Sequence, residues 1–248
     1  MAALNQPQAS DSAAPRLAVL IPAHNEKLTV GEVVQGVLAR LHCETVVIDD
    51  ASTDGTVQSA RRAGATVLPL TLQLGAWGAT QTGIRYALRH GHRTVITMDA
   101  DGQHDSAYIP ALLQPILNGN ADVVIGACPE RVSRARRLAW SYFRLITGLH
   151  LEDITSGFRA YNLAAMRILA TAEASLLDYQ DVGVLMILRR KGLRTVEVAV
   201  PMGARKTGIS RVFSSWWVVA KYMVQTSLLC IARVGFGKPN KSSNGNVP

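Results

Sequence analysis

The sequence predicts a mixed α/β fold in which helices cover both faces of a mainly parallel central sheet. Short runs rich in β-branched residues alternate with helix-length amphipathic stretches, as is typical of parallel strands joined by crossover helices. The runs are also continuously apolar, which fits a sheet covered on both faces. The predicted strands are LAVLI (17–21), TVVID (45–49), TVLPL (66–70), TVITM (94–98), DVVIG (122–126) and TVEVAV (195–200).

Helices are predicted between these strands from apolar spacing and capping residues. The first has apolar residues at helical spacing: Val30, Val33, Val34, Val37, Leu38 and Leu41. The second follows STDGT (52–56), whose Ser, Thr and Asp are all capable N-caps, and Gly64 can end it. A third is predicted at 83–90. Beyond residue 127 the alternation fails, and two stretches look mainly helical: 131–148 and 163–191.

The chain is predicted to form one domain with polar ends. We expect a disordered leader at 1–15, the folded domain at 16–212, a basic amphipathic helix at 213–237 and a disordered tail at 238–248. Residues 213–232 have about the length of a membrane span, but Lys221 and Gln225 lie within them. Full spanning is therefore disfavoured, and two interpretations compete: a helix on the bilayer surface and a helix packed against the domain.

The charge is unevenly distributed. The net charge is +8, yet residues 1–188 hold 15 Lys and Arg against 17 Asp and Glu, whereas residues 189–248 hold 11 Lys and Arg against Glu197 alone. The positive C-terminal quarter suits phosphates or an anionic membrane surface. Nucleic acid is not an expected partner, because no zinc finger, helix-turn-helix or RNP-like pattern is present.

Several other functional classes are disfavoured. The three cysteines are far apart and odd in number, which argues against a disulfide framework and a cysteine zinc site and favours a reducing, intracellular setting. The chain has no G-x-G-x-x-G after a strand and no P-loop. It also lacks the G-x-S-x-G of serine hydrolases. Metal-assisted transfer chemistry remains.

Three predicted strands lead into acidic residues. The first is followed by Glu26, the second ends in Asp49 and Asp50, and the fourth is followed by Asp99 and Asp101. Ligands of parallel sheets gather beyond the carboxyl ends of the strands. Clustered buried carboxylates repel one another and are costly to desolvate, so we expect a cation or hydrogen-bond donors among them.

The pair Asp99 and Asp101 suits a hard divalent ion. Two carboxylates one residue apart leave the other coordination positions to water and a substrate diphosphate, as Mg and Mn sites prefer. Gln103 and His104 follow closely and could add a ligand or support one. A simple helix-capping role is the alternative, and it is the favoured one for Asp54.

Five motifs, in order, resemble those of family 2 glycosyltransferases, in the branch that contains dolichyl- and polyprenyl-phosphate mannosyltransferases and glucosyltransferases. They are PAHNE (22–26), VVIDDASTDGT (46–56), LGAWGATQTGIRYA (74–87), MDADGQHD (98–105) and DITSGFRAYN (153–162). The resemblance covers about residues 17–212. It implies a GT-A fold, inversion at the anomeric carbon and a Mg or Mn ion.

The resemblance also implies site residues. The donor nucleotide sugar would contact Pro22, Ala23, Asn25, Glu26, Asp49, Asp50, Ser52, Asp54, Asp99, Ala100, Arg205 and Arg211. The metal would be held by Asp99, Asp101 and Gln103, and the catalytic residues would be Asp99, Asp101, Asp181 and Arg205. Arg205–Arg211 matches the family's R-x-x-G-x-S-[KR] loop. His24 and Gln73 depart from the usual pattern, and the register of Asp181, the candidate base, is uncertain because it could simply cap a helix.

A basic stretch at 130–144 suggests where an acceptor phosphate binds. Its arginines alternate with aromatic residues, which suits a phosphate headgroup at a bilayer surface, although a solvated helix face is the alternative. The predicted acceptor residues are Arg131, Arg134 and Arg137, joined through the resemblance by Ser156, Arg159 and Ser210. An acceptor that is already an anion would need no strong general base.

The favoured hypothesis is an enzyme that moves mannose or glucose from a GDP- or UDP-sugar to polyprenyl or dolichyl phosphate. It would be cytoplasmic and peripheral at the cytoplasmic face of a membrane. A membrane partner subunit is conceivable. Three alternatives stay open: transfer to a sugar hydroxyl or small soluble acceptor, an idle nucleotide-sugar-binding module, and a metal-dependent nucleotidyltransferase.

Overall fold

A computed structural model describes residues 16–128, 151–154, 156–175 and 182–203. The predicted leader, the helical stretch at 131–148 and the amphipathic helix at 213–237 lie outside these residues. The proposed domain limits therefore stay predictions.

The described strands form one sheet in the order β3-β2-β1-β4-β6-β5-β7. They are β1 Leu17–Ala23, β2 Glu44–Asp49, β3 Thr66–Pro69, β4 Thr94–Thr97, β5 Val123–Ala127, β6 Arg159–Asn162 and β7 Thr195–Ala199. All neighbours pair in parallel except β6, which is antiparallel to both β4 and β5. The predicted mainly parallel sheet is confirmed, and β6 is a strand that we did not predict.

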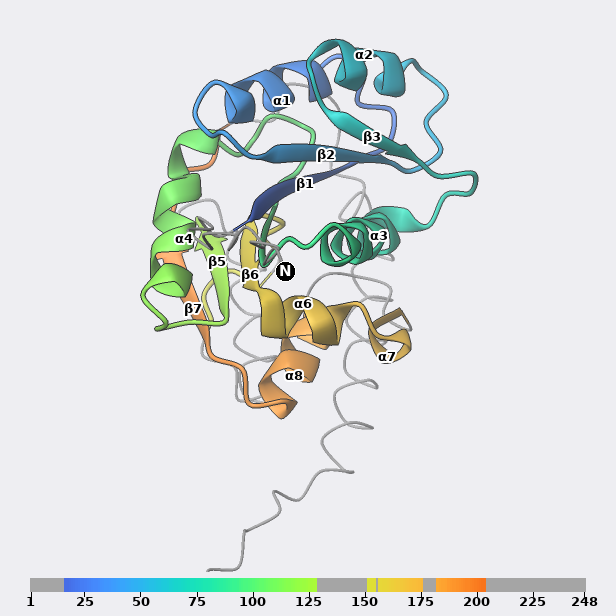
Figure 1. The fold of residues 1–248 in the computed structure, drawn as a ribbon. Helices are drawn as coiled ribbons and strands as arrows, with labels where there is room; N and C mark the ends of the chain where they lie inside the picture. Colours follow the sequence, from blue (N-terminus) through green and yellow to red (C-terminus); the bar gives the residue numbers. More distant parts are fainter. Residues whose placement is uncertain (1–15, 129–150, 155, 176–181, 204–248) are drawn as a thin grey trace, which may run out of the picture.

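Helices cover both faces of this sheet, as expected. They are α1 Val30–Leu38, α2 Thr56–Arg62, α3 Gly75–Arg89, α4 Ile109–Leu117, α6 Leu163–Leu169, α7 Ala172–Ser175 and α8 Val182–Arg190, with a 3-10 turn at Ser106–Tyr108. One apolar core lies between the sheet and α1, α2 and α4. The other lies between the sheet and α3, α6, α7 and α8. Figure 1 shows α1 and α2 on one side of β1–β3 and α3 on the other.

Helix α3 lies unusually close to the sheet. A side-chain carbon at Gly83 would come within 2.8 Å of Ile48 Cδ1, so only glycine allows this approach. The other flank of α3 is fixed to the α6–α7 region, because Trp77 Nε1 donates to the carbonyl of Ala174 at 2.8 Å and Gln81 Nε2 to that of Leu169 at 2.8 Å. These contacts hold the amino end of α3 beside the end of β2.

The predicted start of α3 was wrong. Helix α3 begins at Gly75 and not at Gly83, because the Asp50 carboxylate accepts from the amides of Leu74 at 2.6 Å and Gly75 at 2.9 Å. Helix α2 begins after Gly55, whose φ of 89° is in the left-handed region that glycine adopts readily. The acceptor that caps α3 thus comes from a tertiary contact that residue spacing does not reveal.

No helix in the described part of the chain is both long and apolar enough to cross a membrane.

We predict that Asp122→Asn lowers the free energy of unfolding at neutral pH by about 1 to 3 kcal/mol. Asp122, just before β5, accepts hydrogen bonds from Asn162 Nδ2 at the end of β6 and from the Arg194 amide just before β7, both at 2.8 Å. It therefore links these three strands. Burial acts to raise the pKa of Asp122, but these hydrogen bonds and the Arg194 charge lower it below its ordinary value.

A lowered native pKa stabilises the fold above the ordinary aspartate pKa, and this contribution is lost as the pH falls through the native pKa. Urea denaturation of both proteins from neutral to acid pH measures it. The stability gap between wild type and Asp122→Asn should close on acidification, and a gap independent of pH would contradict the assignment.

Candidate active site

The carboxyl ends of β1, β2 and β4 meet at one side of the sheet, which we call the carboxyl edge. Their parallel pairing places Ala23 beside Asp49 and Leu20 beside Thr97. The loops that follow β1, β2 and β3 lie together on one side of the molecule, at the right in Figure 1. The predicted convergence of acidic strand ends is therefore present in the fold.

The loops after β1 and β2 brace each other through Asn25 and Ser52. The Asn25 amide donates to Ser52 Oγ at 2.9 Å, and the Thr53 amide donates to Asn25 Oδ1 at 2.9 Å. Asn25 has a φ of 55°, and asparagine tolerates this left-handed region better than most residues. Asn25 and Ser52 thus fix the two loops against each other. Donor contacts of Asn25, Ser52, Pro22 and Ala23 stay predictions.

Asp49 and Asp50 are adjacent in sequence but differ in their surroundings. Both side chains are buried. Asp50 uses both carboxylate oxygens to cap α3, whereas Asp49 Oδ2 accepts from the Ser52 amide at 3.3 Å and Asp49 Oδ1 has no partner among the described residues. A buried oxygen without a partner is costly. Asp49 is therefore the better placed of the two to accept a hydrogen bond from a ligand.

Glu26 and Asp54 hold the loops at the same edge. Thr29 Oγ1 donates to Glu26 Oε2 at 3.1 Å. Asp54 accepts from the amides of Thr56 at 3.0 Å and Lys27 at 3.2 Å. Burial acts to raise the pKa of Asp54, but the hydrogen bond from the Thr56 hydroxyl and those from the Lys27 and Thr56 amides lower it below its ordinary value. The capping interpretation of Asp54 agrees with these contacts.

Asp99 and Asp101 occupy the turn after β4, again with unequal exposure. The Asp99 side chain is 47% exposed, and its Oδ2 lies 3.3 Å from Nε2 of the buried His104. Asp101 is buried, and its Oδ1 accepts from the Gln103 amide at 3.0 Å. Gln103 Nε2 lies 3.5 Å from the carbonyl of Gly203. Asp99 therefore presents a carboxylate outward, while Asp101 is fixed within the turn.

A loop from a distant part of the chain supports Asp99. A side-chain carbon at Gly157 would meet both Asp99 carboxylate oxygens, with Oδ2 at 2.8 Å. The Gly157 carbonyl accepts from Thr97 Oγ1 at 2.8 Å. Glycine is thus needed where the loop before β6 passes the Asp99 carboxylate, and this supporting role is one that residue spacing did not predict.

Arg159, a predicted acceptor residue, is fully buried and binds backbone carbonyls. Its Nη1 has no partner among the described residues, and its contact with an acceptor stays a prediction. Its Nε donates to the carbonyl of Ser156 at 2.8 Å and its Nη2 to that of Ile154 at 2.7 Å. The guanidinium thus fixes the carbonyls of Ile154 and Ser156. Ser156 is also buried, and its Oγ accepts a hydrogen bond from the Phe158 amide at 3.3 Å.

Glu197 anchors the start of the same loop. Its carboxylate accepts from the amides of Glu152 at 2.7 Å and Asp153 at 2.8 Å. Burial raises the pKa of Glu197 above its ordinary value in spite of these hydrogen bonds. The loop that supports Asp99 is therefore held at both ends, by Glu197 and by Arg159.

Several predicted site residues lie outside the described part of the chain: Arg131, Arg134, Arg137, Asp181, Arg205, Ser210 and Arg211. Their roles stay predictions. The last described residues reach the site, since the Gly203 amide donates to the Gln103 carbonyl at 2.8 Å and Met202 forms a bridge with His104.

Comparison with known proteins agrees with this geometry. The sequence pattern of Glycosyl transferase family 2 matches residues 18–173. The chain belongs to this family. It is a glycosyltransferase, as the five motifs predicted.

Two curated relatives extend the match over most of the chain. The glycosyltransferase is 32% identical over 219 residues to an undecaprenyl-phosphate mannosyltransferase of Micrococcus luteus, covering 79% of this chain and 87% of the relative. It is 28% identical over 225 residues to a polyprenol monophosphomannose synthase of Mycolicibacterium smegmatis, covering 81% and 82%.

A solved structure confirms the GT-A fold. Glucosyl-3-phosphoglycerate synthase from Mycobacterium tuberculosis, crystallised with Mn2+, UDP-glucose and phosphoglyceric acid, superposes with a TM-score of 0.68. The match covers 90% of this chain and 81% of that one, at 21% identity. At this identity the likeness shows the fold alone.

The carboxyl edge fits a metal whose coordination is completed by a ligand. Within the described residues, no three His, Cys, Asp or Glu side chains converge as a metal site. Asp99 and Asp101 supply two carboxylates from one turn, which is the number that Mg2+ sites commonly use together with substrate phosphates and water. That Asp99 and Asp101 hold a metal stays a prediction.

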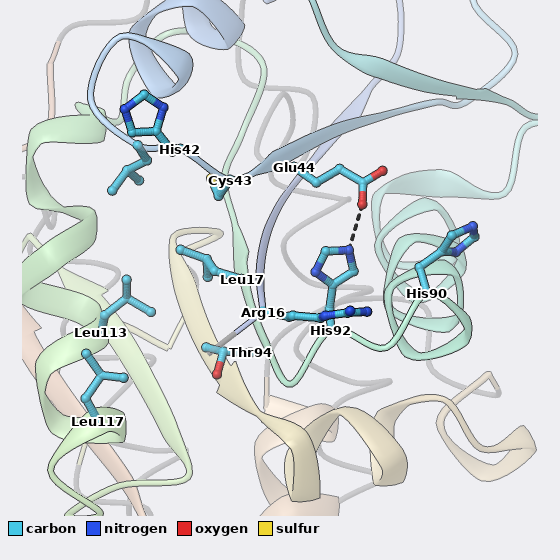
Figure 2. Close-up of a pocket in the computed structure, with 11 residues that line it drawn as sticks. Arg16, Leu17, His42, Cys43, Glu44, His90, His92, Thr94, Leu113 and Leu117 are labelled. Atoms are coloured by element: carbon cyan, nitrogen blue, oxygen red, sulfur yellow. Dashed lines mark hydrogen bonds and ion pairs between the residues drawn. The ribbon is translucent and has the colours of Figure 1, made fainter. Parts of the chain in front are cut away.

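A separate cavity of about 650 Å3 lies at the opposite edge of the sheet. Figure 2 shows its lining, with Leu113 and Leu117 of α4 facing the starts of β1 and β2. Its polar end is a Glu44–His92 pair joined at 2.6 Å. Because none of the predicted site residues lines this cavity, it is distinct from the carboxyl edge.

We predict that Arg159→Met lowers the free energy of unfolding by about 2 to 4 kcal/mol, because two buried carbonyls lose their donor. Urea denaturation measures the loss, with the exposed Arg62→Met as a control that should lie close to wild type. Unchanged stability in Arg159→Met, together with a raised KM for a phosphate acceptor, would instead favour the acceptor prediction.

Proposed function

We propose that this glycosyltransferase moves mannose from GDP-mannose to a polyprenyl phosphate, with inversion at the anomeric carbon. The observation that carries the proposal is the 32% identity to an undecaprenyl-phosphate mannosyltransferase across 79% of the chain. The site geometry supports it, because a half-exposed Asp99 and a buried Asp101 lie in the turn after β4, at the edge of the sheet where ligands of parallel sheets bind.

In the proposed reaction, an oxygen of the lipid phosphate attacks the anomeric carbon of mannose. The bond from that carbon to the diphosphate breaks, and GDP leaves with the electron pair. A bound Mg2+ or Mn2+ would neutralise the diphosphate charge. Asp99, Asp101 and Gln103 would hold the ion.

The chain's other residues position the reactants. Asp49 Oδ1 would accept a hydrogen bond from the nucleoside, which satisfies a buried oxygen that has no partner in the described residues. Asp50 would act indirectly by holding the loop before α3. A phosphate acceptor is already ionised at neutral pH, so this route needs no strong general base. Asp181 would then be dispensable for proton removal.

The test is release of nucleoside diphosphate from GDP-mannose, UDP-glucose and UDP-N-acetylglucosamine, with Mn2+ and with or without polyprenyl phosphate. We expect release from GDP-mannose only when the lipid phosphate is present. Release that needs a soluble sugar or phosphoglycerate acceptor would favour the small-acceptor alternative. Release of pyrophosphate would indicate nucleotidyl transfer.

We predict that Asp101→Asn lowers kcat about 100-fold or more, because it removes a charge that holds the ion next to the leaving group. Asp105→Asn is the matched control. Asp105 lies in the same loop, but it is exposed and caps the following turn by accepting from the Ala107 amide at 2.8 Å. Equal losses in both variants would contradict a specific role for Asp101.

A further inference from the structure

His24 is a half-buried residue that directly follows β1 and departs from the usual family pattern. Its Nδ1 lies 2.6 Å from the carbonyl oxygen of Asp50. Its Nε2 lies 3.2 Å from Asn25 Nδ2. Both ring nitrogens therefore contact residues that shape the loops after β1 and β2.

The hydrogen-bond partners of the ring determine where its hydrogen lies. The Asp50 carbonyl oxygen can only accept, so Nδ1 must carry a hydrogen. The Thr53 amide donates to Asn25 Oδ1 at 2.9 Å, which identifies the Asn25 atom facing His24 as Nδ2, a donor. Nε2 must then accept, and an accepting ring nitrogen carries no hydrogen. His24 is consequently neutral in this arrangement, with its hydrogen on Nδ1.

A second proton on His24 would break this network. An imidazolium donates from both nitrogens, so its Nε2 hydrogen would point at the Asn25 Nδ2 hydrogens. Flipping the Asn25 side-chain amide would offer Oδ1 to His24, but it would also turn Nδ2 toward the Thr53 amide, which is another donor. One hydrogen bond is lost in either orientation of Asn25.

The same bonds hold the loops at which a donor is predicted to bind. Asn25 has a φ of 55°, and its own amide donates to Ser52 Oγ at 2.9 Å. Asp50, on the other side of the ring, caps α3 with its carboxylate. The charge of His24 therefore acts on the conformation of both loops.

Charged groups at the carboxyl edge act on the same proton. Most of those on the loops and turns after β1, β2 and β4 are acidic and favour the imidazolium, whereas the single lysine opposes it. They are Glu26, Lys27, Asp49, Asp50, Asp54, Asp99 and Asp101. The neutral ring is thus favoured by its hydrogen bonds to Asp50 and Asn25 and not by the surrounding charge.

We propose that neutral His24 is a positioning residue for the donor nucleotide, acting through Asn25 and Asp50, and that its protonation weakens nucleotide binding. Histidine changes charge between about pH 5 and 8. Because the neutral ring is the competent form, nucleotide affinity should be full above this range and fall as the pH falls through it. The proposal rests on the proposed function only in taking the carboxyl edge as the nucleotide site.

Nuclear magnetic resonance tests the protonation state directly. Long-range proton–nitrogen correlation spectra of the full-length protein show which ring nitrogen carries the hydrogen, and His24→Asn assigns the His24 signals by their loss. At about pH 8 we expect the neutral form with its hydrogen on Nδ1. A hydrogen on Nε2 at this pH, in either the neutral or the charged ring, would overturn the proposal.

Calorimetric titration with GDP and with UDP, each with Mn2+, tests the consequence between about pH 8 and pH 5.5. The variant His24→Asn keeps a donor for the Asp50 carbonyl but cannot gain a proton. His42→Asn is the matched control, because His42 is exposed and lines the cavity at the opposite edge. Over this range we expect the affinity of wild type and His42→Asn to fall about tenfold more than that of His24→Asn.

The two proposals can fail separately. The same pH dependence in all three proteins would overturn the role of His24, whichever acceptor the enzyme uses. The expected pH dependence, combined with no transfer to polyprenyl phosphate, would contradict the proposed function and support the role of His24 in nucleotide binding.

Discussion

The loop with Gly157 lies beside the Asp99 carboxylate because of the direction of strand β6. Strand β6 runs antiparallel between β4 and β5, so its beginning, and not its end, lies at the carboxyl edge. The loop before β6 therefore enters the site, where Thr97 Oγ1 binds the Gly157 carbonyl across 60 residues of sequence. Arg159 and Glu197 hold that loop from either end, and a parallel strand in the same place would bring different residues to Asp99.

The acidic residues at this edge divide into two groups. Asp50 and Asp54 are satisfied by backbone amides, which balance the cost of burying charge. Asp49 keeps one buried oxygen without a partner in the described residues, and Asp99 keeps an exposed carboxylate. The first group shapes the loops, and a ligand contact stays a prediction for the second. The sequence alone does not separate the two groups, because the separation depends on which backbone amides lie next to each carboxylate in the fold.

Much of the fold was predictable because buried parallel strands leave continuous apolar runs. All six predicted strands are present. Strand β6 was missed because it is only four residues long and contains Arg159, a residue that would not be expected in a buried strand. Arg159 itself was read as an acceptor ligand because an arginine in a recognised motif suggests phosphate binding. Its burial depends on the carbonyls of the preceding loop.

The site predictions depended on the resemblance more than on residue spacing. Spacing placed Asp49, Asp50, Asp99 and Asp101 at one edge, and the structure brings them there. The supporting role of Gly157 could have been suspected from a glycine one residue before a bulky Phe158, but only the fold shows that it faces Asp99.

The account depends most on Asp99 binding a metal at a position where Gly157 leaves room for its carboxylate. Electron paramagnetic resonance titration of Mn2+ in the presence of GDP tests this directly in wild type, Gly157→Ala and Gly36→Ala. Gly36 is a fair control because an added carbon there meets nothing closer than 3.4 Å. We expect Gly157→Ala to weaken Mn2+ binding about 10- to 100-fold, as loss of a residue that orients a metal ligand does, with Gly36→Ala unchanged. Equal Mn2+ affinity in all three proteins would contradict the account.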